Sequence, residues 1–290
     1  MKLSRMVMLS LVGLAALAQT AIVGAQDSGK KARVLMVTQS KEFTHGPVKR
    51  KGEELALSEI AITQLGQTTG LFTTHCTQNA ADFTEENLKK YDIVCFYTQA
   101  AAPLPIKEED AKYFVNTWLK QKGHAFVGFH SATDTYRNDN AADAWYREMI
   151  GGTFNGHPWG SGTTVTITVH DQKHPSTKML GSEFQIKDEI YQYKYWVPEN
   201  VHVLMSLNME KCEPKVAYHV PVAWVKNWGE GKIFYTNLGH NDSTWADKRF
   251  TEHITGGFRW VLNLDEGDAT PNPKVSAEEE LKAKAVAAKK

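Results

Sequence analysis

The residues best suited to chemistry in this 290-residue sequence are histidines and carboxylates that stand in short loops. His130 is the clearest case, because it directly follows the apolar run 125–129 and Asp134 lies four residues later. If the turn is helical, the two side chains share one face, and a carboxylate beside an imidazole fixes its tautomer and raises its basicity. A general base and a metal ligand both need that arrangement. The structural alternative is that Ser131 and Asp134 cap a helix while His130 is packed.

Three more histidines stand in similar settings. His45 and His240 each neighbour a glycine, and His157 lies between a glycine and a proline, so all three are predicted to lie in tight loops. A single histidine in a loop is usually only a polar loop residue. Together with His130, however, they fall in the loops expected to face a ligand, and this predicts one shared site.

The adjacent carboxylates Asp188 and Glu189 interrupt an otherwise apolar and aromatic segment. Such a pair is costly to bury unless each carboxylate is paired. Neighbours on a strand point to opposite faces, so only one can face a given site, and Glu189 is the better candidate. The alternative is a solvated edge strand. We therefore predict catalytic roles for four residues, namely His130, Asp134, Glu189 and His240.

Aromatic side chains near these groups are candidates for stacking against a sugar ring through its axial C–H groups. Trp159 and Trp245 lie in loops beside candidate histidines, although core packing is the alternative for any tryptophan. No H-E-x-x-H signature occurs, so a divalent metal ion would need scattered ligands. The residues predicted to bind substrate are His45, His157, Trp159, Asp188, Tyr191 and Trp245.

The elements that must position these groups alternate between strand and helix. In such alternation the sheet is mostly parallel and doubly wound, and ligands bind beyond the carboxyl ends of its strands. The loops 38–45, 98–105 and 130–134 are therefore where chemistry is expected. Apolar runs predict strands at 33–37, 72–77, 91–97 and 125–129, and the segments between them predict helices at 47–64, 84–88 and 108–120.

The second half of the sequence is richer in strands. Trp228-Gly229-Glu230-Gly231 supplies a hairpin turn, and a helix at 248–262 closes the domain. We predict one α/β domain with a parallel sheet and β-rich insertions. The further strands are expected at 163–169, 184–195, 201–207, 220–226 and 232–236.

The two ends of the sequence differ from its middle. A positive start, an apolar run at 6–18 and the small residues Val23-Gly24-Ala25 predict a secretory signal peptide over 1–25, followed by a linker over 26–32. The alternative is an uncleaved N-terminal anchor. The expected location is the periplasm or the extracellular space. Residues 264–290 are polar and predict a tail beyond the domain at 33–263.

Composition excludes some partners. The sequence has 33 basic and 33 acidic side chains and no basic stripe, so nucleic acid and anionic membranes are poor candidates. No membrane span is expected in the mature chain. Its three cysteines are Cys76, Cys95 and Cys212. Cys95 lies in an apolar run and is expected in the core. Export would permit a Cys76–Cys212 disulfide, but nothing in the sequence supports one.

Five motifs together resemble the trehalose-utilisation (ThuA-like) family. The resemblance spans about 33–263 and implies a flavodoxin-like fold, similar to class I glutamine amidotransferases. In those enzymes the nucleophile is a cysteine at a strand-to-helix elbow. Here His130 holds that place and Ser131 follows it, so glutamine hydrolysis through a thiolate is not expected. A hydrolase with Ser131 as nucleophile is a further alternative. The motifs are F-T-H-G-P-V at 43–48, G-F-H-S-A-T-D at 128–134, G-G-T-F-N-G-H-P at 151–158, D-E-I-Y at 188–191 and G-K-I-F-Y-T-N-L-G-H at 231–240.

The resemblance also implies a role in sugar catabolism, including routes through 3-keto disaccharides. A keto group acidifies the neighbouring C–H, so one base and one electrophile can open a glycosidic bond by elimination. His130 or Glu189 is the expected base. The electrophile is expected to be His45, His157, His240 or a divalent metal ion. The alternative is a non-catalytic protein that binds sugar or assists a periplasmic degradation system.

Overall fold

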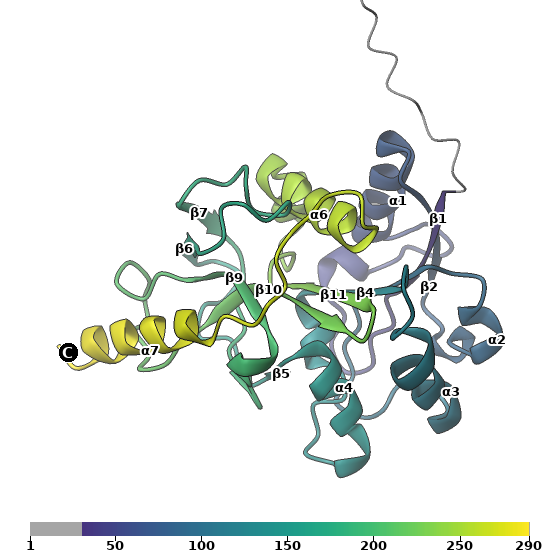
Figure 1. Cartoon of the computed structure of the whole chain (residues 1–290), viewed down its shortest axis with the longest axis horizontal. Helices are drawn as coiled ribbons and strands as arrows, with labels where there is room; N and C mark the ends of the chain where they lie inside the picture. Colours follow the sequence, from purple (N-terminus) through teal and green to yellow (C-terminus); the bar gives the residue numbers. More distant parts are fainter. Residues whose placement is uncertain (1–30, 290) are drawn as a thin grey trace, which may run out of the picture. The chain divides into compact units, whose positions relative to one another are not determined.

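A nine-stranded sheet runs through residues 31–289, the part of the chain that the computed structural model describes (Figure 1). The predicted signal peptide lies outside these residues. Five neighbouring strands are parallel, in the order 2-1-3-4-5 that is typical of flavodoxin-like folds. The predicted fold class is therefore confirmed. These strands are β2 (Phe72–Thr77), β1 (Ala32–Val37), β3 (Ile93–Phe96), β4 (Ala125–Phe129) and β11 (Gly231–Thr236).

The β-rich second half continues the same sheet with antiparallel strands. The predicted hairpin turn joins the first of them to β11, with Trp228 paired to Gly231 and Gly229 at a φ of 64°. A separate two-stranded ribbon pairs β5 (Thr153–Phe154) with β8 (Tyr193–Lys194). The antiparallel strands follow in the order β10 (Pro221–Trp228), β9 (His202–Leu207), β6 (Thr164–Val169) and β7 (Glu183–Lys187).

Helices cover both faces of the parallel half of the sheet. Successive residues of a strand point to opposite faces, so Met36 of β1 packs in one apolar cluster and Leu35 in the other. The helices α1 (Leu57–Thr69) and α6 (Lys248–Val261) pack on the first face. The second face is covered by α2 (Glu85–Leu88), α3 (Glu108–Tyr113) and α4 (Ala144–Ile150) (Figure 1).

Helix α1 begins ten residues later than the sequence predicted. Pro47 lies in a short 3-10 turn (Gly46–Val48), and Gly52 then adopts a left-handed φ of 61°, which no right-handed helix can contain. The helix starts where Glu59 accepts a hydrogen bond from the backbone N–H of Ala56 at 2.8 Å. The loop after β1 is thereby lengthened.

The C-terminal segment differs from the predicted tail. Residues from Pro273 to Ala287 form helix α7, which packs against β9. Small side chains make this contact: Ser276 and Ala283 are buried, whereas the larger Leu281 is 68% exposed. The sequence suggested an unpacked segment because it lacks large apolar residues, but small residues let a helix approach a sheet closely.

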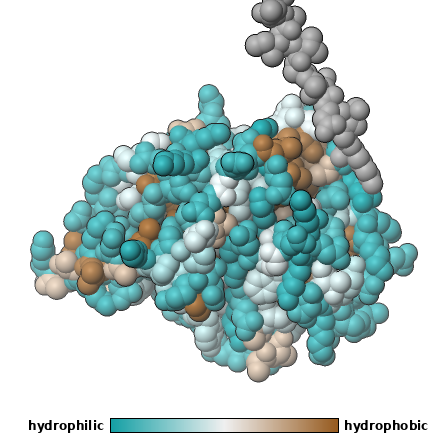
Figure 2. Space-filling model, viewed as in Figure 1, coloured by the Kyte–Doolittle hydropathy of each residue, from teal (hydrophilic) through white to brown (hydrophobic). Residues whose placement is uncertain are grey.

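Further observations concern membrane-spanning helices, the hydropathy of one face and the three thiols. No helix within residues 31–289 is long and apolar enough to cross a membrane. Figure 2 shows a mostly hydrophilic face with small apolar patches near α1 and α7. Cys76, Cys95 and Cys212 are free thiols, so the Cys76–Cys212 bridge does not form. Cys76 lies on β2 at one end of the sheet, whereas the Cys212 thiol contacts Thr166 on β6, seven strands further along the sheet order.

Candidate active site

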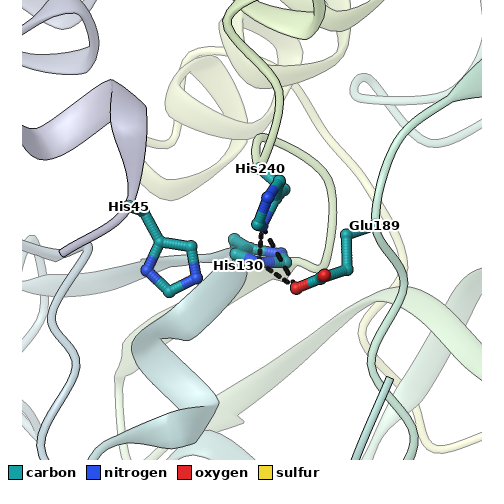
Figure 3. Close-up of side chains that lie close together, drawn as sticks. All are labelled: His45, His130, Glu189 and His240. Atoms are coloured by element: carbon teal, nitrogen blue, oxygen red, sulfur yellow. Dashed lines mark hydrogen bonds and ion pairs between the residues drawn. The ribbon is translucent and has the colours of Figure 1, made fainter. Parts of the chain in front are cut away.

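The candidate site lies at the carboxyl ends of the parallel strands. His45 stands in the loop after β1, His130 follows β4 directly, and His240 lies in the loop after β11. Glu189 enters from the segment that follows β7. Figure 3 shows the four side chains meeting from these separate segments. This is the sheet edge where ligands bind in folds of this class.

His130 occupies a strained turn between β4 and a 3-10 helix that spans His130–Asp134. Its φ of 37° is in the left-handed region that non-glycine residues seldom adopt. The imidazole is fully buried, and its Nδ1 lies 2.7 Å from the carbonyl oxygen of Asn237. A carbonyl can only accept, so Nδ1 carries a hydrogen, and in the neutral form of the ring the lone pair of Nε2 faces the cluster.

Glu189 is the carboxylate on which the imidazoles converge. Its Oε1 lies 3.1 Å from Nδ1 of His240 and 3.6 Å from Nε2 of His130. Its Oε2 lies 3.5 Å from Nδ1 of His157, whose side chain is 51% exposed. Burial raises the pKa of Glu189, but the contacts with His130 and His240 outweigh it and hold the pKa well below its usual range. Glu189 is therefore ionised.

His45 closes the cluster from the side of β1. Its Nε2 lies 3.1 Å from the hydroxyl of Tyr191, and its ring centroid is 5.0 Å from that of His130 and 5.1 Å from that of His240. Burial lowers the pKa of His45 to about 2, and positive charge on His130 or His240 acts in the same direction. His45 is thus a neutral imidazole at physiological pH.

Asp188 holds the loop that carries His240. Its Oδ2 accepts the backbone N–H of Gly239 at 2.7 Å, and its Oδ1 accepts that of Asn241 at 2.8 Å. The hydroxyl of Tyr97 and Nε1 of Trp245 both donate to the carbonyl of Gly239. Asp188 and Trp245 therefore position the loop, and their contact with substrate stays a prediction.

The predicted pairing of Asp134 with His130 does not form. Asp134 instead accepts hydrogen bonds from Gln99 at 3.0 Å and from Arg137 at 2.7 Å. The reason is the 3-10 geometry of the turn, in which three residues complete a turn, so residue i+4 faces about 120° away from residue i. Thr133 takes the stacked position and donates to the carbonyl of His130. Asp134 thus braces the loop and does not orient the imidazole.

Two further expectations fail because the side chains are buried. Trp159 has no exposed surface and packs in the apolar core, so it cannot offer a face to a sugar. Ser131 is also fully buried, and its hydroxyl has no hydrogen-bond partner within the described residues. A nucleophilic serine needs an adjacent base, so the alternative of a Ser131 hydrolase loses its support.

Two contributors were missed at the sequence level. Asn237 orients His130 through its main-chain carbonyl, which every residue type possesses, so no sequence signal marks it. Phe43 is 57% exposed and its ring stands edge-on to His45 at 4.8 Å. It begins the motif F-T-H-G-P-V, and an aromatic two residues before a candidate histidine could have flagged it. Phe43 is the better candidate for contact with a ligand.

The cluster can also hold a cation. His45, His130, Glu189 and His240 each offer one donor atom, and these four atoms lie within 4.8 Å of one another. Three imidazoles and one carboxylate arranged in this way suit metal binding or proton transfer. The site and sheet order together define a flavodoxin-like α/β protein with a buried histidine–glutamate centre at the carboxyl edge of its sheet.

Comparison with known proteins places the chain in a family. The model of the ThuA family, described as trehalose utilisation, matches residues 33–261, so the chain belongs to that family. The resemblance inferred from the five motifs is confirmed. The search among curated proteins found no match.

Solved structures support the fold. A ThuA-like protein from Bacteroides uniformis is 20% identical, with a TM-score of 0.61 over 85% of this chain and 98% of that one. A ThuA-like protein from Parabacteroides merdae is 14% identical, with a TM-score of 0.59 over 82% and 92%. A cytoplasmic protein from Salmonella typhimurium is 8% identical, with a TM-score of 0.52 over 79% and 98%. Identities this low show the shared fold alone.

Proposed function

We propose that this protein is an enzyme that opens glycosides carrying a keto group, and that Glu189 and its surrounding histidines form the reacting centre. The observation that carries the proposal is the ionised Glu189, held among His130, His157 and His240 at the ligand-binding edge of the sheet. The family's description as trehalose utilisation supports a sugar as the substrate class.

The chemistry follows from the acidity of a C–H bond beside a ketone. In a 3-keto-glycoside, a base takes the proton from C2 and the electron pair forms an enolate with the oxygen on C3. The enolate then collapses, a C1–C2 double bond forms, and the C1–O bond breaks with protonation of the leaving oxygen. Addition of water across C1–C2 completes hydrolysis without net oxidation or reduction. The site must supply a base and a stabiliser of the enolate oxygen.

The Glu189–His157 pair is the proposed proton carrier. His157 is the half-exposed member of the cluster and contacts Oε2 of Glu189, so a proton can pass from the site to solvent. His130 is a poor carrier because it is fully buried and its Nδ1 hydrogen is committed to Asn237. The groups on the other side of Glu189, His130 and His240, face the position where enolate charge would be stabilised.

The test uses a chromogenic substrate and its unoxidised parent. We expect the purified protein to release nitrophenol from a nitrophenyl 3-keto-glucoside but not from the nitrophenyl glucoside, whose C2 proton is not acidified. In deuterated water the product should carry deuterium at C2. Glu189→Gln is expected to lower kcat by at least about 100-fold, and His157→Gln by at least about tenfold. The matched control is His75→Gln, because His75 is an exposed residue of β2.

The competing function is non-catalytic sugar binding. It predicts that keto-glycosides bind without nitrophenol release and without exchange at C2, whether or not a divalent metal ion is added. That result would overturn the enzyme proposal and leave the binding reading in place. If the unaltered protein releases nitrophenol and Glu189→Gln releases it equally fast, the enzyme proposal stands but Glu189 is not part of the reacting centre.

We also propose that the chain is exported to the periplasm or the medium. The support is the charged start, apolar run and Val23-Gly24-Ala25 pattern at residues 1–25. Expression of the full sequence in a Gram-negative host should give a periplasmic protein whose N-terminus, by mass, is Gln26. Recovery of the uncleaved chain from the cytoplasm would contradict export.

A further inference from the structure

We propose that His130, His240 and Glu189 form three corners of a binding site for one divalent first-row transition metal ion, with His45 as a fourth donor. The ion would lie at the same centre as the proposed reaction, but its binding does not depend on a sugar being the substrate.

The spacing of the three donor atoms matches a metal polyhedron. Nε2 of His130, Nδ1 of His240 and Oε1 of Glu189 lie 3.1, 3.1 and 3.6 Å apart around a closed triangle. Metal bonds to histidine nitrogen and carboxylate oxygen of about 2.1 Å give a tetrahedron with edges of about 3.4 Å. The triangle therefore has the size of one face of a tetrahedral site.

Hydrogen bonding alone leaves this triangle incompletely satisfied. Because Nδ1 of His130 donates to Asn237, the neutral form of the ring has its Nε2 lone pair directed toward Oε1 of Glu189 and Nδ1 of His240. A hydrogen on Nδ1 of His240 can point at only one of these acceptors. Two lone pairs then face each other in a buried space, which is unfavourable unless a cation lies between them.

His45 approaches from the fourth side at a longer distance. Its ring stands nearly perpendicular to those of His130 and His240, at 83° and 87°, so an edge of the ring is presented to them (Figure 3). Its donor atom still lies within 4.8 Å of the other three. A tight triangle with a looser fourth donor leaves room for an oxygen of water or substrate on the ion, as catalytic metal sites require.

The residues behind the donors also match a metal site. Metal-bound histidines usually donate their second ring N–H to a carbonyl or carboxylate, and His130 does so to Asn237. The side chain of Asn237 is itself fixed to the backbone N–H and carbonyl of Tyr191, at 3.1 and 3.0 Å. Asp188 fixes the backbone on both sides of His240. The donors are thus held in place before any ion binds.

The donor set indicates the class of metal. Mg²⁺ and Ca²⁺ prefer all-oxygen surroundings, whereas imidazole nitrogen with one carboxylate suits zinc, iron, cobalt, nickel or manganese. A bound ion of this class would polarise the ketone oxygen and stabilise the enolate, which deepens the proposed function. The alternative occupant of the triangle is a proton, which would make one histidine a buried imidazolium.

The test measures metal binding directly. Protein made without a polyhistidine tag is stripped with chelator, and Zn²⁺ and Co²⁺ are titrated by calorimetry with elemental analysis of the dialysed product. We expect one ion per chain and, for Co²⁺, the intense visible absorption of a site with fewer than six ligands. His240→Ala and Glu189→Gln should each weaken binding by more than about 100-fold, since loss of even an outer-shell partner costs 10–100-fold.

Controls separate a lost ligand from a lost fold. His253→Gln and His75→Gln remove histidines outside the cluster and should bind metal like the unaltered chain. Circular dichroism must show each variant folded; if His240→Ala does not fold, Glu189→Gln carries the test. Absence of binding by the folded unaltered chain, or equal binding by Glu189→Gln, overturns the metal site. Metal binding without turnover rejects only the enzyme proposal, and full turnover after chelation rejects only the ion's role.

Discussion

Nε2 of His130 lies 3.1 Å from Nδ1 of His240, although 110 residues separate the two in sequence. The contact exists because β4 and β11 are parallel neighbours, with Thr236 paired to Phe129, so that the loops leaving both strands start side by side. The two histidines therefore form one structural unit whose geometry is set by the sheet.

A double-mutant cycle should reveal this unit. His130→Asn, chosen because asparagine tolerates the left-handed φ, and His240→Ala are each expected to lower kcat/KM by at least about 100-fold. The double variant should be little worse than either single variant, because groups that act together are strongly non-additive. The measurement is kcat/KM for the keto-glucoside with all four proteins. Additive losses would mean that the two histidines act independently.

The sequence predicted the parallel half of the sheet to within one or two residues. Strands such as β2 and β4 are short runs of apolar, aromatic or β-branched residues bounded by turn residues. The local residue pattern is enough to predict them. The start of α1 was wrong because a single left-handed glycine, Gly52, breaks a segment whose composition otherwise allows a helix. The packing of α7 was missed because it depends on small residues, not on an apolar stripe.

The site could be predicted only in part, for a different reason. Loop position after parallel strands correctly brings His45, His130 and His240 together, because strand order makes those loops neighbours. The role of Asp134 could not be inferred from the sequence. The residue that shares a face with His130 is three positions later in a 3-10 turn but four positions later in an α-helical turn. The contact between the Asn237 carbonyl and His130 could not be predicted, because side-chain identity does not reveal main-chain contacts. Trp159 was misassigned because burial depends on the tertiary fold.

Replacing Asp188 should damage both stability and turnover. In Asp188→Asn an amide NH₂ must face either the N–H of Gly239 or that of Asn241, and two opposed donors cost about 1–3 kcal/mol of folding free energy. The displaced loop should also misplace His240 and lower turnover. Urea unfolding and keto-glucoside kinetics measure the two effects.

Asp247→Asn is the matched control for that variant. Asp247 also accepts a backbone N–H, from Arg249 at the start of α6, but it is bonded to no residue of the histidine–glutamate cluster. A loss of stability with unchanged kcat/KM is expected. Equal losses of turnover in the two variants would show that Asp188 acts through general stability and not through the loop.

Asp134 should prove dispensable for chemistry. Its carboxylate is bonded to Gln99 and Arg137, so Asp134→Asn is expected to reduce stability by about 1–2 kcal/mol while kcat/KM stays within about threefold of the unaltered value. Glu189→Gln, measured beside it, should lose at least about 100-fold. A loss of that size in Asp134→Asn would restore the role that the sequence suggested for it.

Stability should fall as the pH drops below about 6.5, because several histidines outside the cluster are buried in neutral form, His253 and His174 among them. Burial lowers the pKa of His253 to about 4 and that of His174 to about 3. Above about pH 7.5 neither the folded nor the unfolded state protonates them, so they contribute no pH dependence. Between pH 6.5 and pH 4 these histidines bind protons in the unfolded state but remain largely unprotonated in the folded state. Each histidine then favours unfolding by up to about 1.4 kcal/mol per pH unit.

His253→Gln isolates one of these contributions. The amide of glutamine can still donate to the carbonyl of Ser176, as Nδ1 of His253 does at 2.8 Å, but it does not titrate. The free energy of unfolding, measured in urea from pH 8 to 4.5, should change with pH less steeply in this variant, by about 1.4 kcal/mol per pH unit below pH 6. Between pH 7.5 and 8 the two proteins should have equal slopes, which controls for other effects of the substitution. Equal slopes below pH 6 as well would mean that His253 is protonated in the folded protein.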